Sequence, residues 1–344
     1  MSKGKILAYI FSIIALIFEG FFGIIPFLQF AFRIIIIAIA IFLLNTIVRS
    51  IFKRGVVYSW KEILPQYILT ILATIGFFTA ISLSFITYQN ATPGVLSDIS
   101  LSNSGQEVVF IEMSHIATPE FYTNKKEAIA ALAQSGYTII MEGVKPGTPE
   151  NQALFNQSIG FDFTPTLYSE IANIIGLQSQ DNKMLFEGIN TGSLVSVDLS
   201  IDEIISLMGT GIVTSTGEVV DIESEIQKTL SALTSRERIF TGWIARGFMN
   251  WSLKQSDDMT SVLTSGSGAQ LFTTIIDRRN DKIIEYIQGH PDQNIAVVYG
   301  ALHFNGVYEA LQRANPTWKM KQIKKYTPYN NTSSVGFKIS ELIF

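Results

Sequence analysis

The feature that most limits what this chain can fold into is its apolar N-terminal region of 88 residues, in a chain of 344. A helix needs about 20 consecutive apolar residues to cross the hydrocarbon core of a bilayer. Such stretches recur here, and we predict three helices over about 6–26, 31–49 and 63–87. The division between the first two is open, so two helices are the alternative. Because a signal peptide holds a single short apolar stretch, the recurrence favours a permanent transmembrane anchor over 1–88.

Charge gives the anchor an expected orientation. Basic residues near membrane spans stay on the cytoplasmic side. They form one cluster at the N-terminus and one before the third apolar stretch (Lys3 and Lys5; Arg49, Lys53, Arg54 and Lys61). Three spans then place everything after Tyr88 outside. We therefore expect an integral membrane protein of the cell membrane, with the bilayer as a partner and the soluble domain on the extracytoplasmic side.

The remainder of the chain has a different composition. The anchor carries seven basic and two acidic residues, a net charge of +5, and the whole chain carries −4, which leaves −9 for the soluble part. An acidic domain is repelled by nucleic acid, so we expect no nucleic-acid partner. The chain has no cysteine, which excludes disulfides, thiolate metal sites and a cysteine nucleophile.

The soluble part begins with a segment rich in Asn, Thr, Pro, Gly and Ser over 89–104, which we interpret as a linker. After it, over 105–344, patterns typical of strands alternate with patterns typical of helices. We expect strands over 107–113, 137–141, 184–189, 294–299, 318–326 and 335–343. We expect helices over 124–134, 166–175, 201–208, 222–254, 269–287 and 307–313. This alternation predicts an α/β domain in which helices cover a central sheet.

Two of the three histidines share one context. His115 and His303 each lie just past the end of an expected strand, and Glu142 follows a third strand directly. Ligands of α/β sheets gather outside the carboxyl ends of the strands. Two imidazoles and a carboxylate are sufficient to hold a divalent metal with an open position. The alternative for each histidine is a hydrogen-bonding loop residue, and for Glu142 a turn at the end of a strand. His290 sits in a turn, and we assign it no role.

Other polar and aromatic residues have two interpretations each. Of the adjacent Arg278 and Arg279, only one can face a crevice, where it could hold a carboxylate or a developing oxyanion. Asp198 or Ser200 is expected to cap the helix that follows them, with Asp198 the favoured candidate. Aromatic residues recur at helical spacing over 236–253, which is typical of a core but also of a contact with the membrane surface or of a lid. The chain lacks the motifs of serine hydrolases, zincins and nucleotide-binding enzymes.

The soluble domain resembles the TraB/GumN/TIKI family. That family shares an early Gly-x-x-His, a following Glu, a late Arg-Asn on a helix, a final Gly-x-x-His and an Asp before a helix. The corresponding residues are Glu112-Met113-Ser114-His115, Glu142, Arg279-Asn280, Gly300-Ala301-Leu302-His303 and Asp198. Glu112 stands where the family has Gly, and its carboxylate could add a ligand, act as a base or disturb the site.

The resemblance implies a mixed central sheet with flanking helices, as in erythromycin esterase and the haem-binding ChaN proteins. It also implies, for the TIKI branch, metal-dependent peptide cleavage with Mn or Co preferred. We expect a divalent metal as the cofactor, which would be Mn, Co or Zn. We therefore expect a membrane-tethered, metal-dependent hydrolase acting on peptides, with His115, Glu142 and His303 as metal ligands and Arg279, Glu142 and His303 as the catalytic set. Arg279 would steady the oxyanion or orient Glu142. The alternative is a non-catalytic, membrane-anchored protein that binds or sequesters a peptide or a haem.

Overall fold

The computed structural model describes residues 3–21, 24–51, 60–159, 166–208, 221–255 and 269–330. The chain divides into two compact units, Met1–Tyr88 and Gln89–Phe344. The first unit is helical, and the second contains the sheets.

The N-terminal unit consists of helices in the three regions where the apolar stretches predict them. They are α1 (Lys3–Phe21), α2 (Ile24–Ile51) and α3 (Trp60–Ala91). Gly76 of α3 lies against the backbone carbonyl of Phe11, and the rings of Phe11 and Phe77 meet edge to face with centroids 5.3 Å apart, so α1 and α3 pack closely. Within the described residues, one helical stretch, Leu64–Ala91, is long and apolar enough to cross a membrane. Of the three spans expected from the sequence, the described residues therefore contain one candidate by length and apolar character.

The second unit contains a six-stranded mixed sheet in the order β6-β4-β7-β2-β1-β8. Strands β6, β4, β7 and β2 run parallel, and β1 runs antiparallel to both β2 and β8. A separate small sheet pairs β3 (Ile116–Ala117) with β5 (Gln178–Ser179). The large sheet comprises β1 (Leu96–Ser102), β2 (Glu107–Met113), β4 (Thr138–Met141), β6 (Leu194–Val195), β7 (Ile295–Gly300) and β8 (Lys319–Tyr326).

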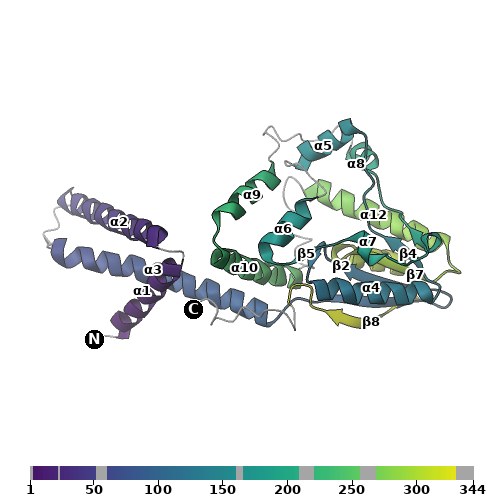
Figure 1. The fold of residues 1–344 in the computed structure, drawn as a ribbon, viewed down its shortest axis with the longest axis horizontal. Helices are drawn as coiled ribbons and strands as arrows, with labels where there is room; N and C mark the ends of the chain where they lie inside the picture. Colours follow the sequence, from purple (N-terminus) through teal and green to yellow (C-terminus); the bar gives the residue numbers. More distant parts are fainter. Residues whose placement is uncertain are drawn as a thin grey trace. The chain divides into compact units, whose positions relative to one another are not determined.

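Helices cover both faces of this sheet (Figure 1). One face packs against α4 (Pro119–Gln134) and α7 (Asn182–Leu185), and the other against α12 (Ala269–Gly289) and α13 (Phe304–Ala314). The remaining helices are α5 (Pro149–Ile159), α6 (Leu167–Ile175), α8 (Ile201–Met208), α9 (Ile222–Ala232), α10 (Ser235–Lys254) and the 3₁₀ turns η1 (Thr191–Ser193) and η3 (Ala301–His303). The expected α/β fold with a mixed central sheet and flanking helices is therefore confirmed.

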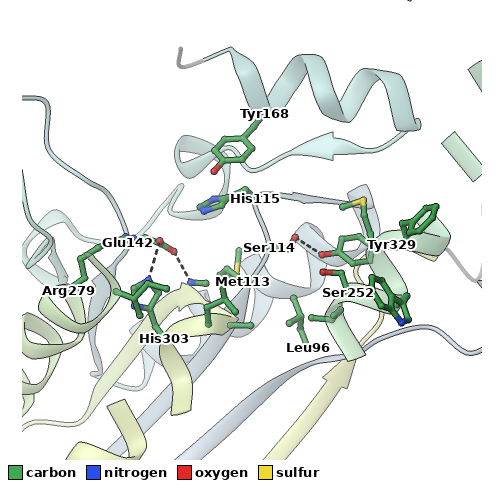
Figure 2. Close-up of a pocket in the computed structure, with 18 of the residues that line it drawn as sticks. Leu96, Met113, Ser114, His115, Glu142, Tyr168, Ser252, Arg279, His303 and Tyr329 are labelled. Carbon is green, nitrogen blue, oxygen red and sulfur yellow. Dashed lines mark hydrogen bonds and ion pairs between the residues drawn. The ribbon is translucent and has the colours of Figure 1, made fainter. Parts of the chain in front are cut away.

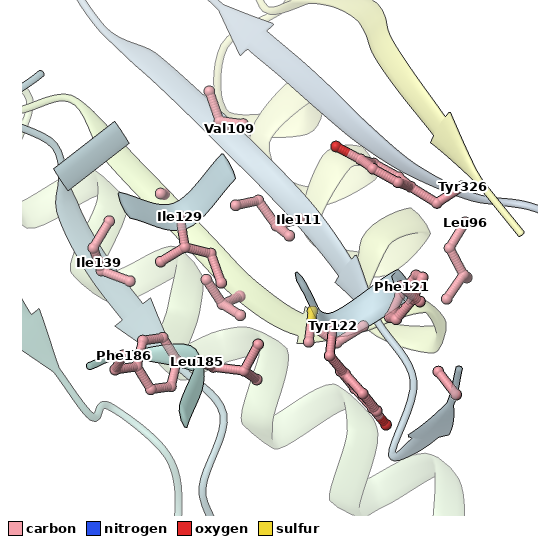
Figure 3. Close-up of a cluster of buried hydrophobic side chains, with 14 residues drawn as sticks. Leu96, Val109, Ile111, Phe121, Tyr122, Ile129, Ile139, Leu185, Phe186 and Tyr326 are labelled. Carbon is pink, nitrogen blue, oxygen red and sulfur yellow. The ribbon is translucent and has the colours of Figure 1, made fainter. Parts of the chain in front are cut away.

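The alternation of side chains along β2 divides the core into two layers. Val109 and Ile111 point into the layer under α4, which Figure 3 shows with Phe121 and Tyr122. Val108 and Phe110 point into the opposite layer, under α12 and α13. Because β2 is buried on both faces, its sequence is an almost continuous apolar run. That run made it the clearest strand in the sequence.

The predicted linker over 89–104 is wrong, because residues Leu96–Ser102 form β1. Its polar residues suggested a linker, but Ser97, Asp98 and Ser100 are buried in this strand. Asp98 accepts hydrogen bonds from Lys125 Nζ and from the Tyr326 hydroxyl, both at 2.7 Å. Ser100 donates to Glu107 at 2.6 Å. The local sequence of this segment resembles a loop, because the partners that bury Asp98 lie far along the chain.

Of three further expectations, two differ from the structure and one lies outside the described residues. The strand expected over 184–189 is wrong, since Asp181 caps the short helix α7 there. The helix expected over 222–254 is two helices, because Thr234 and Glu237 form a capping box that starts α10. The strand expected over 335–343 lies outside the described residues.

Candidate active site

Three of the predicted site residues reach one pocket because their strands are neighbours in the sheet. His115 follows β2, Glu142 follows β4 and His303 follows β7, and β7 lies between the other two with all three strands parallel. Their carboxyl ends therefore meet at one edge. A cavity of about 700 Å³ at this edge is lined by all three residues and by Arg279. Figure 2 shows Glu142, Arg279 and His303 gathered at one end of this pocket.

Glu142 is held at both oxygens. Its Oε1 accepts from Arg279 Nη2 at 2.6 Å, and its Oε2 accepts from the backbone N–H of Gly300 at 2.7 Å. Burial alone would raise the pKa of this carboxyl, but the charge of Arg279 outweighs it and holds the pKa below its ordinary value. Glu142 is therefore an oriented, ionised carboxylate at neutral pH.

Arg279 connects this carboxylate to a second one. Its Nε and Nη2 donate to the two oxygens of Asp198, each at 2.7 Å, and its guanidinium lies 5.8 Å from the centre of the Tyr299 ring. Burial disfavours the charged form, but the two carboxylates outweigh this and raise the pKa of Arg279 above its ordinary value. The adjacent Arg278 is more than half exposed and pairs with Asp281. Arg279 is thus the arginine of this pair that faces the pocket.

His303 is buried and oriented from behind. Its Nδ1 lies 2.7 Å from Oδ1 of Asn280, and since an amide oxygen only accepts, Nδ1 carries the proton. The Asn280 amide in turn lies against Gly306, where a Cβ would collide with its nitrogen. Burial lowers the pKa of His303 to about 4, so the ring is neutral at pH 7. Its unprotonated Nε2 then faces Oε1 of Glu142 at 3.8 Å.

His115 completes the set from the opposite side. Its ring stacks on Tyr168 with centroids 4.7 Å apart, and Figure 2 shows it between Tyr168 and the group around Glu142. Among the described residues, no three His, Asp or Glu side chains lie close enough together to hold a metal ion as they stand. The donor chemistry nevertheless fits one. Two acceptors, Nε2 of His303 and Oε1 of Glu142, face each other in a buried place. A cation between them would pair with the Nε2 lone pair and add a second positive partner to Oε1, beside Arg279.

Two sequence interpretations change with the structure. Asp198 does not cap α8: its carboxylate accepts from Gly143 N and binds Arg279. Ser200 caps that helix instead, in a reciprocal bond with Glu203. Glu112 does not line the pocket, since its carboxylate accepts from the backbone N–H of Ser97 at 2.6 Å. A role for Glu112 as a base in this pocket is therefore wrong.

Sequence reasoning missed part of the pocket. Tyr168 of α6 and Leu96 of β1 line it, and no local motif marks either residue. Phe248 and Trp251 of α10 also line it, and the aromatic spacing that suggested a core or a lid was the available signal. His290 lies elsewhere, with Nδ1 bonded to the carbonyl of Tyr286.

Comparison of the chain with family models, with curated proteins and with solved structures gives no match. The resemblance to the TraB/GumN/TIKI family therefore rests on the motif residues alone, and what that family implies enters below as a proposal.

Proposed function

We propose that this protein is a membrane-anchored, metal-dependent hydrolase of the TraB/GumN/TIKI type that cleaves amide bonds, with peptides as the substrate class the resemblance implies. The observation that carries the proposal is the pairing of His303 and Glu142. A neutral imidazole with Nδ1 bonded to Asn280 presents an Nε2 lone pair to a carboxylate 3.8 Å away. This arrangement of a histidine with its far nitrogen anchored is the one used by metal ligands.

His115, Glu142 and His303 would hold the ion, which would be Mn, Co or Zn. When bound, such an ion lowers the pKa of a bound water and polarises a scissile carbonyl. Of the chain's own groups, Arg279 keeps Glu142 ionised and oriented, and Gly300 N–H fixes the second oxygen of Glu142. Asp198 anchors Arg279 in turn. The charged pair is nine-tenths buried, so bulk water is kept away from it.

The N-terminal unit supplies the proposed tether. We propose that α3 crosses the membrane and that α1 and α2 contribute two further spans, with the α/β domain on the extracytoplasmic side of the cell membrane. The support is the apolar character of α3 over Leu64–Ala91 and the two clusters of basic residues.

The metal and the hydrolysis are tested together on the full chain in nanodiscs. We expect a divalent metal by elemental analysis, cleavage of a fluorogenic peptide library, and loss of cleavage with EDTA. His303→Ala should lose both metal and activity, and His290→Ala is the matched control, because His290 lies outside the pocket. Full cleavage after complete chelation would reject the metal-dependent mechanism.

A second candidate is a non-catalytic protein that binds an apolar peptide or a haem. One observation favours it: both oxygens of Glu142 are already bonded to protein groups. In that case a ligand would co-purify, binding would survive chelation, and no library peptide would be cleaved.

A further inference from the structure

The wall of the pocket away from Glu142 is apolar and uncharged. Glu142 and Arg279 are the charged residues among the described ones that line the cavity, and they pair with each other. Strands β1 and β2 and helix α10 contribute the side chains of Leu96, Met113, Phe248, Met249, Trp251 and Leu253. Phe248 and Trp251 are 51% and 39% exposed, although aromatic side chains of this size are usually covered. A ligand that packed on them would remove that surface from water.

The hydroxyl groups toward the far end of the pocket have partners of their own. Figure 2 shows Tyr329 on the side of the pocket away from Glu142, with Ser114 between the two. The hydroxyl oxygens of Ser114 and Tyr329 lie 3.2 Å apart, and Ser114 also donates to the carbonyl of Ile116 at 2.7 Å. A charged group carried to this end would lose part of its hydration against the apolar wall, and the described lining residues there offer it no ionic partner. A peptide main chain laid along the wall would bury N–H and C=O groups opposite apolar side chains.

We propose that the substrate of this pocket is an N-acyl amine whose acyl part is an uncharged alkyl chain lying along the Leu96, Phe248 and Trp251 wall. The inference rests on the proposed function for its chemical step alone, the cleavage of an amide bond, and it names a different substrate class from the peptides that the resemblance implies. In that step the oxygen of water bonds to the acyl carbon, the C–N bond breaks, and the amine leaves with a proton from the water. The products are a fatty acid and an amine, and no other reactant is required.

Binding is tested on the full-length protein in nanodiscs, with three amides whose alkyl chains have the same length. The probes are octanamide, suberamic acid, which carries a carboxylate at the far end of the chain, and ω-aminooctanamide, which carries an ammonium there. We expect octanamide to bind at least about tenfold more tightly than either charged analogue, because both charges are desolvated without a partner. Fluorescence of Trp251 reports binding, and Trp251→Phe should lose the signal. A bound metal ion would attract the carboxylate of one analogue and repel the ammonium of the other. Weaker binding of both analogues therefore cannot be caused by a metal.

A matched pair of variants tests where the alkyl chain of the ligand lies in the pocket. Phe248 and Ile239 lie on the same helix α10 and are each 51% exposed, but Phe248 lines the cavity and Ile239 does not. Phe248→Gln should weaken octanamide binding about tenfold. Ile239→Gln should leave it unchanged. An equal loss in both variants would contradict the assigned wall.

Three results would overturn the inference: acetamide binding as tightly as octanamide, either charged analogue matching octanamide, or acetyl-trileucine amide binding more tightly than octanamide. Hydrolysis is scored separately with octanoyl p-nitroanilide. If octanamide binds and the anilide is not cleaved, the ligand class stands and the proposed hydrolase fails. If library peptides are cleaved and octanamide does not bind, the hydrolase stands and the ligand class is wrong.

Discussion

At the scale of single residues, the site depends on how burial and hydrogen bonds fix protonation. His303 is kept neutral by burial, and its proton is kept on Nδ1 by Asn280. Glu142 is kept ionised by Arg279 in the same small space. One group is thus an unprotonated base and the other an anion at neutral pH, a combination suited to holding a cation.

Replacing the amide behind His303 should change its protonation. In Asn280→Asp a carboxylate faces Nδ1–H and stabilises the imidazolium, so the pKa of His303 should rise above its value of about 4. Titration of the imidazole ring protons by NMR measures this. Asn305→Asp adds the same charge at an exposed position of α13 and should move the pKa of His303 far less. Equal shifts in the two variants would show that Asn280 does not act through its bond.

The buried His303 should also make stability depend on pH in the metal-free protein. Its pKa is about 4 in the folded state, against 6.5 for an ordinary histidine. Below pH 6.5 His303 binds a proton in the unfolded chain but stays unprotonated in the folded state. The free energy of unfolding therefore falls as the pH falls. From pH 6.5 to about pH 5 the loss should be roughly 2 kcal/mol. Urea unfolding at several pH values measures it. The loss should largely disappear in His303→Gln and persist in His290→Gln.

At the scale of elements, α4 is attached to β1 by a buried ion pair. Lys125 is fully buried, with Nζ 2.7 Å from Asp98 and 4.2 Å from the centre of the Tyr326 ring. Burial lowers the pKa of Lys125, and Asp98 opposes that effect. The pair joins strands β1 and β8 to the helix, and it explains why an acidic residue stands inside a buried strand.

Breaking one half of that pair should be costly. Asp98→Asn leaves a buried ammonium without its counter-charge and should lower the free energy of unfolding by about 3 kcal/mol or more. The double variant with Lys125→Met removes both charges and should recover most of the loss. Lys126 is also on α4, and it forms a more exposed ion pair with Glu187. Lys126→Met should therefore leave the unfolding midpoint unchanged. A double variant no more stable than the single one would contradict this account.

The elements that could be predicted are those with a local signal. Strands β2, β4 and β7 and most helices follow from apolar runs and periodicity. The positions of His115, Glu142 and His303 follow from the strands that precede them. Strand β1 could not be predicted, because Asp98 and Ser100 find their partners through the tertiary fold. The bond from Asp198 to Arg279 was equally hidden, since 81 positions separate the two residues.

At the scale of the whole molecule, the chain combines an apolar helical unit with an acidic α/β unit. We expect removal of residues 1–88 to shift the protein from the membrane fraction to the soluble fraction. A fusion of alkaline phosphatase after Tyr88 should be active outside the cytoplasm, and one after Gly55 should be inactive. The reverse pattern would place the α/β unit in the cytoplasm.

The edge strand β8 affects how separate copies of this protein interact with one another. Within the described residues it pairs on one side only, with β1, and it carries Lys319, Lys321, Lys324 and Lys325 along an exposed length. A protein confined to a membrane surface meets copies of itself far more often than one free in solution. Four ammonium groups on this strand would repel the same strand of another copy, so the proposed anchoring would concentrate copies in two dimensions without joining their sheets edge to edge.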